Sequence, residues 1–217
     1  MPRRMRIFLS DAVYHVINRG NQRQPVFIDE ADYYFYLLLL KAAKEKYGVK
    51  IFHYVLMPNH VHLLVQSSSA DSISKMMQSV TVGHCRHFNA KYEKVGHAWQ
   101  GRFRSIIIDS ASYMLQCGRY IELNPVRARI CASPKDYRWS SYHHYADSHR
   151  DSLVDDDFML KIFGDSVDVQ RAAYKKFVED ELLNARSHLS QRFSEKLIYG
   201  DNIFVARIKK LYNVRST

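Results

Sequence analysis

Cysteine is scarce in this chain, and the three that occur are not spaced for shared chemistry. The 217 residues contain Cys85, Cys117 and Cys131, an odd number with no Cys-x-x-Cys pair. A disulfide framework needs an even set, and a thiolate zinc site needs paired cysteines. The cysteine content therefore argues against both and fits a reducing, cytoplasmic environment.

Long apolar runs and a nucleotide-binding loop are also missing. The longest apolar run, residues 33–40, is far shorter than the roughly 20 residues that a membrane-spanning helix needs. The N-terminus lacks the apolar region of a signal peptide. No Gly-x-x-x-x-Gly-Lys loop is present, so no nucleotide cofactor is implied. We therefore expect a protein that uses neither a membrane nor ATP.

Acidic residues are the minority among the charged residues. The chain carries 32 Lys and Arg against 22 Asp and Glu, which gives a formal net charge of +10 at pH 7. Such a surplus favours a polyanionic partner, either nucleic acid or an anionic membrane surface, although many basic proteins bind neither. The length allows one domain with a substantial extension.

The pattern of apolar residues predicts an α+β fold. A period of two indicates strands over 12–18, 49–56, 60–66 and 103–109. A period of 3.6 indicates helices over 29 or 30 to 47, 73 to 92, and 110 or 112 to 123. This order is that of the ferredoxin-like split βαβ arrangement, an antiparallel sheet in which the first and third strands form the central pair.

The C-terminal third of the chain is predicted to be an α-helical extension. Residues 146–157 are acidic and polar, which is typical of a linker. Helices are indicated over 166–184 and 202–212. We therefore expect a compact domain over residues 1–145, followed by a linker and helical extension over residues 146–217.

The segment 57–65 (MPNHVHLLV) contains two histidines at the start of an apolar run. Side chains alternate between the two faces of a strand, so His60 and His62 share one face and Val61 lies on the other. Two imidazoles at this spacing form half of a metal site. The alternative is a pair of structural histidines, because the chain contains 11.

Tyr120 and Asn124 lie on the last predicted helix of the compact domain. They are four residues apart and therefore share one helical face. A tyrosine hydroxyl beside a metal-bound phosphate can act as a nucleophile, and an amide oxygen can be a third ligand for a hard cation. The alternatives are that Tyr120, one of 15 tyrosines, is structural, and that Asn124 caps a helix that begins at Pro125.

Five separated blocks resemble the single-tyrosine HUH transposases, and within them the REP-associated tyrosine transposases. The blocks are residues 14–21 (YHVINRGN), 57–62 (MPNHVH), 99–103 (WQGRF), 120–128 (YIELNPVRA) and 138–142 (RWSSY). The resemblance covers about residues 12 to 145. Insertion-sequence relatives often carry glutamine where Asn124 stands, and the asparagine favours the REP-associated branch.

The resemblance implies a function for each of these residues. His60, His62 and Asn124 would bind Mg²⁺ or Mn²⁺, and Tyr120 would attack a phosphodiester of single-stranded DNA near a hairpin. The products would be a 5′-phosphotyrosine and a free 3′-hydroxyl, with later rejoining and no use of ATP. Insertion-sequence relatives imply a dimer that exchanges the tyrosine helix, whereas the REP-associated branch implies a monomer. The helical extension favours a monomer with the tyrosine acting in cis, and we expect a cytoplasmic, nucleoid-associated protein.

Basic and aromatic residues near these blocks are candidate DNA contacts. Arginine side chains hold phosphates, and exposed aromatic rings stack on unpaired bases. The candidates are Arg19, Arg23, Arg102, Arg104, Arg127 and Arg129 for phosphates, and Trp99 and Phe103 for bases. For each of them, a solvated surface charge or a core aromatic is the alternative.

Two other functions are compatible with the sequence. One is a catalytically silent protein that binds hairpin DNA. The presence of all four candidate active-site residues, His60, His62, Tyr120 and Asn124, disfavours it. The other is a metal-dependent hydrolase that uses water, in which Tyr120 is only structural. A denaturant-stable protein–DNA adduct distinguishes the transposase-like reaction from both.

Overall fold

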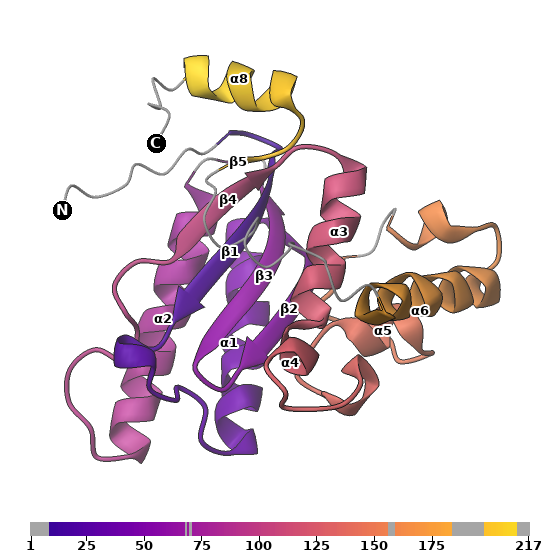
Figure 1. The fold of residues 1–217 in the computed structure, drawn as a ribbon. Coiled ribbons are helices and arrows are strands. Elements are labelled where there is room, and N and C mark those ends of the chain that lie inside the picture. Colours follow the sequence, from indigo (N-terminus) through magenta and orange to yellow (C-terminus); the bar gives the residue numbers. More distant parts are fainter. Residues whose placement is uncertain (1–8, 68, 70, 156–158, 184–197, 212–217) are drawn as a thin grey trace.

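The computed structural model has the α+β architecture that the sequence predicts (Figure 1). It describes residues 9–67, 69, 71–155, 159–183 and 198–211. The strands are β1 (Val13–Arg19), β2 (Val49–Met57), β3 (His60–Ser67), β4 (Arg104–Ile108) and β5 (Ile198–Tyr199). The α-helices are α1 (Glu30–Tyr47), α2 (Ser72–Lys91), α3 (Ala111–Glu122), α4 (Asn124–Arg127), α5 (Tyr142–Ala146), α6 (Val167–Leu183) and α8 (Asn202–Leu211). The 3₁₀ helices are η1 (Asn21–Arg23), η2 (Pro134–Asp136) and η3 (Leu160–Phe163).

The strands form one sheet in the order β2-β3-β1-β4-β5. Neighbouring strands are antiparallel except β4 and β5, which run parallel. The first and third strands therefore pair near the centre of the sheet, and this prediction is confirmed. Their register places Ile17 opposite His62 and Arg19 opposite His60. The strand β5 was not predicted, because two residues are too few to show a period.

Helices cover both faces of the sheet. α1 and α2 lie on one face, and α3 lies on the other (Figure 1). Val61 and Leu63 of β3 are fully buried in the core. His62 occupies the alternate position and meets the ring of Tyr120 from α3. The alternation along β3 thus divides it into an apolar face and a histidine face, as the sequence predicts.

Helix α1 begins and ends at residues whose chemistry favours those roles. The Asp29 side chain accepts a hydrogen bond from the backbone of Asp32, and the Asp32 carboxylate accepts one from the backbone of Asp29. Gly48 ends the helix with a left-handed φ of 63°, which glycine adopts without steric cost. The predicted start at 29 or 30 and end at 47 are confirmed.

Residues 146–155, predicted as part of a linker, instead pack against β2. The hydroxyl of Tyr54 donates to the Asp151 carboxylate at 2.6 Å. The backbone N–H of Ile51 donates to Asp155, which also pairs with Lys44 at 2.6 Å. The acidic residues that suggested a solvated linker therefore accept hydrogen bonds from a strand. Residues 156 and 157 of the predicted linker lie outside the described residues, as do Asn184 and Tyr212 at the ends of the predicted C-terminal helices.

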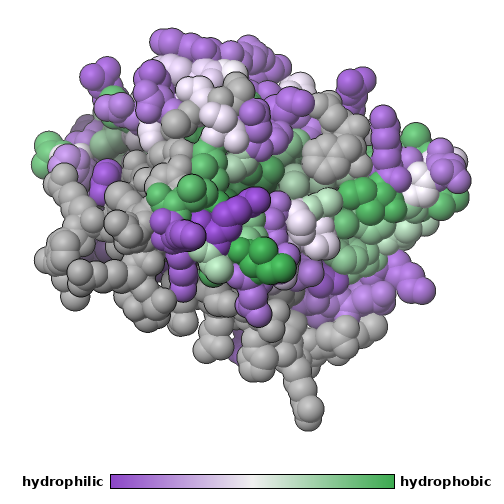
Figure 2. Space-filling model, turned by 90° about the horizontal axis from the view of Figure 1, so that it is seen from above, coloured by the Kyte–Doolittle hydropathy of each residue, from purple (hydrophilic) through white to green (hydrophobic). Residues whose placement is uncertain are grey.

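The surface of the described part of the chain mixes polar and apolar side chains. Seen from above, hydrophobic side chains are exposed at the side where α6 lies in Figure 1 (Figure 2). Ile162, Val167 and Val169, of η3 and α6, are about half exposed. None of the described helices combines the length and the apolar character needed to cross a bilayer.

His84 allows a pH test of this core. Its ring is buried on α2 and contacts the rings of Phe27, Tyr36 and Trp99. Burial lowers the pKa of His84 to about 4, whereas histidine in an unfolded chain titrates near 6.5. Between these values only the unfolded state takes up the proton. We therefore expect His84 to lower the free energy of unfolding by about 3 kcal/mol as the pH falls from about 6.5 to about 4.

Urea unfolding from neutral pH to about pH 4 measures this effect. A His84→Leu variant should show a shallower decline in the free energy of unfolding. All other ionisable groups are the same in both proteins, so the difference between the two curves isolates His84. Parallel curves for the two proteins would contradict the expectation.

Candidate active site

One open cavity brings together the residues that the sequence singles out. It has a volume of about 420 Å³ and lies where β1 and β3 meet the end of α3. His60, His62, Tyr120 and Asn124 all line it. The other lining residues are Ile17, Asn18, Arg19, Gln100, Arg102 and Arg104. Four segments that are separate in the sequence, within 17–19, 60–62, 100–104 and 120–124, therefore contribute to a single cavity.

Each of the two histidines has one ring nitrogen engaged by a neighbour. Nδ1 of His60 lies 2.6 Å from Oδ1 of Asn59, whose amide nitrogen donates to the carbonyl oxygen of Arg23. Since Oδ1 only accepts, Nδ1 of His60 is the donor. Nδ1 of His62 lies 2.8 Å from Nε2 of His15 on β1. The bond to Asn59 leaves Nε2 of His60 as the atom that can bind a metal, and Nε2 of His62 is available in the same way when its Nδ1 donates to His15.

Burial keeps both histidines neutral. It lowers the pKa of His60 to about 4, with a smaller contribution from the charge of Arg19. It also lowers the pKa of His62 well below its ordinary value, together with His15, His60 and Arg19. Neutral imidazole is the form that binds metal ions. The pair is therefore in its metal-binding form at neutral pH.

Tyr120 points from α3 toward these rings. It is 7% exposed, and its ring makes edge-on contacts with His15 and His62, each with 5.9 Å between ring centroids. Burial raises the pKa of Tyr120, while the charge of Arg127 and a hydrogen bond with Asn124 act in the opposite direction. The phenol is therefore protonated at neutral pH in the protein without a bound cation.

Asn124 directs its amide nitrogen back along the helix. Nδ2 donates to the carbonyl oxygen of Tyr120 at 2.8 Å, which leaves Oδ1 as the atom that can bind a cation. The short helix α4 begins at Asn124, and its N-cap is Leu123. The alternative role of Asn124 as the N-cap is therefore wrong by one residue. Pro125 occupies the first turn of α4, as expected.

The side chains at this cavity fit a hard divalent cation that shares its coordination with a substrate. Within the part of the chain that the structure describes, no group of three or more His, Cys, Asp or Glu is arranged to hold a metal. A site here would therefore need the Asn124 oxygen beside the two imidazoles. Such a set leaves positions for phosphate and water oxygens, which Mg²⁺ and Mn²⁺ accept.

Comparison with known protein families assigns the chain. The family described as transposase, IS200-like, matches residues 8–124, which is more than half of the chain. The chain belongs to the IS200-like transposases. The matched segment begins before β1 and ends at Asn124, so it includes all four residues that suggested the chemistry. The resemblance to insertion-sequence-like transposases is confirmed.

One solved transposase structure shows the same fold as this transposase. A REP-associated tyrosine transposase, solved bound to a REP hairpin, matches with a TM-score of 0.57 and 18% identity over 71% of this chain and 98% of its own. A second structure, described as a transposase from Deinococcus radiodurans R1, is 17% identical over 59% of this chain and 92% of its own, with a TM-score of 0.39. No curated protein matches the chain.

Only some of the arginines predicted to contact phosphates lie at the cavity of the transposase. Arg19, Arg102 and Arg104 line the cavity. Arg23 and Arg129 are exposed but are not among its lining residues. Three of the six candidate arginines therefore line the cavity.

Three further candidates are engaged within the protein. Arg127 lies over the Tyr120 ring at 5.2 Å, and its Nη2 atom is 3.3 Å from the Glu181 carboxylate of α6. Trp99 and Phe103 are buried in the core, at 5% and 8% exposure. Stacking on a base requires an accessible ring face, so the predicted stacking is not possible in this conformation. Both residues are core aromatics, which was the alternative to a DNA contact.

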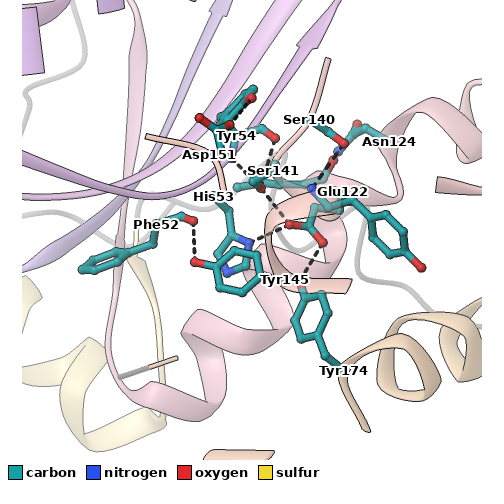
Figure 3. Close-up of polar contacts among 12 residues, drawn as sticks. Phe52, His53, Tyr54, Glu122, Asn124, Ser140, Ser141, Tyr145, Asp151 and Tyr174 are labelled. Atoms are coloured by element: carbon teal, nitrogen blue, oxygen red, sulfur yellow. Dashed lines mark hydrogen bonds and ion pairs between the residues drawn. The ribbon is translucent and has the colours of Figure 1, made fainter. Parts of the chain in front are cut away.

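Sequence reasoning missed the partners of the site residues. His15 lies in the first matching block, but nothing in its spacing shows that it contacts His62 across two strands. Glu122, two residues after Tyr120, is fully buried in a separate network (Figure 3). Its carboxylate accepts hydrogen bonds from His53 at 2.9 Å, from Ser141 at 2.7 Å, and from a tyrosine of α6 at 2.6 Å. Glu122 is therefore not positioned as the base for the phenol.

Proposed function

We propose that this IS200-like transposase cleaves and rejoins single-stranded DNA beside a hairpin, with Tyr120 as the nucleophile. The observation that carries the proposal is the shared cavity, in which a tyrosine, two neutral histidines and an asparagine lie together. The net charge of +10 and the fold of a relative solved with hairpin DNA support a DNA substrate. All four residues belong to one chain, which supports action in cis by a monomer.

The charge of the cavity supports a phosphate ligand. Among the described residues, its lining contains Arg19, Arg102 and Arg104 and no carboxylate. The phosphate backbone of DNA would supply the negative charge that the lining of the cavity lacks. We propose that His60, His62 and Asn124 hold Mg²⁺ or Mn²⁺, which neutralises charge that develops on the phosphate.

The proposed reaction exchanges one ester bond for another. The phenol oxygen of Tyr120 attacks the phosphorus, and the bond from phosphorus to the 3′ oxygen breaks. The phenol loses its proton and the departing 3′ oxygen gains one, so the step consumes neither water nor ATP. A 5′-phosphotyrosine remains on the protein, and attack on it by a 3′-hydroxyl rejoins a strand.

A covalent adduct tests this function. The protein is mixed with labelled single-stranded hairpin DNA and Mn²⁺ or Mg²⁺, and the products are separated under denaturing conditions. We expect a protein–DNA band that requires the cation. Binding without an adduct would support a silent hairpin-binding protein, and cleavage without an adduct would support a hydrolase that uses water.

His15 should be required for tight cation binding. Side chains that hold the second nitrogen of a metal-bound histidine typically change affinity by about 10–100-fold, and His15 holds Nδ1 of His62 at 2.8 Å. We expect His15→Phe to weaken Mn²⁺ binding by about that factor, measured by electron paramagnetic resonance with hairpin DNA in a Tyr120→Phe background. His15→Gln, whose amide can replace the bond, should retain more affinity.

A matched control for this experiment is His143→Phe. His143 lies on α5, is partly buried and pairs with Asp147, and it does not line the cavity. This control should bind Mn²⁺ like the parent protein. Equal affinity in the His15→Phe variant would show that His62 is oriented without His15.

A further inference from the structure

Helix α6 presents one face to the helix that carries Tyr120. Tyr174, Phe177 and Glu181 recur at intervals of three and four, so they lie on the same side of α6. Each of them contacts Arg119 or Glu122 of α3. Polar and aromatic side chains of α6 therefore contact charged side chains of α3.

The contacts at this interface are charged and largely buried. The Glu181 carboxylate pairs with Arg119 at 2.8 Å, and the side chain of Glu181 is 6% exposed. Arg119 also donates to the carbonyl oxygen of Phe177 at 3.1 Å and lies 4.2 Å from its ring centroid. The hydroxyl of Tyr174 donates to Glu122 at 2.6 Å (Figure 3). Such buried, charge-assisted bonds have a fixed geometry.

A second carboxylate bond extends this interface to α4. Glu181 accepts from Arg127 at 3.3 Å, and the Arg127 guanidinium lies over the ring of Tyr120. The carboxylate of Glu181 therefore binds both Arg119, which precedes Tyr120, and Arg127, which covers its ring. Glu181 thus connects α6 to both sides of the tyrosine.

These bonds restrain rotation of α3 about its own axis. Successive residues of an α-helix are about 100° apart, so Arg119 and Glu122 project on a different side of α3 from Tyr120. Gly118 lies so close to His53 of β2 that an added Cβ atom would be 2.5 Å from its Nε2. α3 is therefore held between the sheet and α6. Any turn of the helix would move the phenol oxygen relative to His60 and His62.

The family match includes the α3 side of this interface but not the α6 side. The match ends at residue 124, before Arg127 and the whole of α6. The REP-associated structure is covered over 98% of its length but leaves more than a quarter of this chain outside the match. The contacts of α6 are thus a feature of this chain beyond the family segment.

We propose that α6 positions the nucleophile, with Glu181 and Tyr174 holding α3 in the orientation at which Tyr120 faces the cavity. This inference rests on the proposed function. It gives the C-terminal helix a role in the reaction without contact between α6 and DNA. A displacement of about 1 Å in a reacting group can cost about 10²-fold in rate, so the effect of the positioning residues is measurable.

The test combines Tyr174→Phe with Glu181→Gln in the full chain. Both substitutions keep the side-chain shape and remove the hydroxyl or the charge. Glu179→Gln is the matched control, because Glu179 is exposed on the same helix. Three quantities are measured: the adduct rate at saturating hairpin DNA, the affinity for the hairpin, and the hydrogen-exchange rate of the α3 amides.

We expect the double variant to form the adduct about 10–100-fold more slowly, with hairpin affinity within about twofold of the parent. Amides of α3 should exchange at least about tenfold faster while those of β1 and β3 do not change. The Glu179→Gln control should match the parent in all three. Unchanged α3 exchange, or an unchanged adduct rate, would overturn the proposal.

Failure of the two proposals gives different results. If the parent protein forms no adduct, the proposed function fails, and the α3 exchange still tests whether α6 holds the helix. If the parent forms the adduct and the double variant equals it, only the positioning role fails. A loss of hairpin affinity at an unchanged adduct rate would also refute the positioning role.

Discussion

Replacement of Tyr120 by phenylalanine should abolish the covalent protein–DNA adduct while leaving hairpin binding intact. The substitution removes only the hydroxyl oxygen, which is the attacking atom in the proposed reaction. The ring can keep its contacts with His15 and His62, so the cavity should keep its shape. Loss of a nucleophile costs at least about 10⁴-fold in comparable covalent mechanisms. A denaturing gel with labelled hairpin DNA measures the adduct.

Tyr113→Phe is the matched control for this experiment. Tyr113 lies on α3 two turns before Tyr120, packs against the ring of Tyr199, and does not line the cavity. It should form the adduct at the parent rate. An adduct that persists in Tyr120→Phe would refute the nucleophile assignment. Cleavage that persists without any adduct would instead show that water is the attacking group.

Replacement of both His60 and His62 by alanine should abolish cleavage and cation binding together. The two rings provide two of the three proposed protein ligands, and Asn124 alone does not hold a divalent ion. Charge stabilisation by a metal contributes several kcal/mol, so we expect the adduct to form at least about 10³-fold more slowly. Hairpin binding, measured without divalent cation, should change little because the arginines remain.

The control for the histidine pair is His97→Ala with His149→Ala. Both residues are exposed, and neither lines the cavity. This double variant should bind Mn²⁺ and form the adduct like the parent protein. Circular dichroism follows the fold of both double variants. If the His60 and His62 substitutions unfold the protein, the structural-histidine alternative gains support.

The sequence predicts the parts of this molecule that follow from local periodicity. Alternation in segment 57–65 places His60 and His62 on one face of β3, and four-residue spacing places Asn124, the first residue of α4, one helical turn after Tyr120 of α3. Gly48 and Asp29 mark the ends of α1 because their preferences are local. These features need only a period or a cap, and each can be read within about two turns of chain.

Features that depend on long-range packing could not be predicted in the same way. The bond between His15 and His62 depends on the register of two strands 47 residues apart. The burial of Trp99 and Phe103 depends on which face of the sheet receives their segment. The sequence pattern indicates that Asp151 and Asp155 are solvated, because β2, the strand that binds them, lies about a hundred residues earlier. In each case the deciding partner is distant in sequence.

The absence of carboxylates from the described lining of the cavity has a thermodynamic consequence. An isolated cation would enter a site that already carries three arginine charges, and it would meet no opposing charge on the protein. Bound DNA reverses that balance, so the cation and the strand should each raise the affinity for the other by the same factor. If the proposed function is correct, the protein binds its divalent cation tightly only when DNA is bound. Without DNA, most of the protein should have no cation in this site.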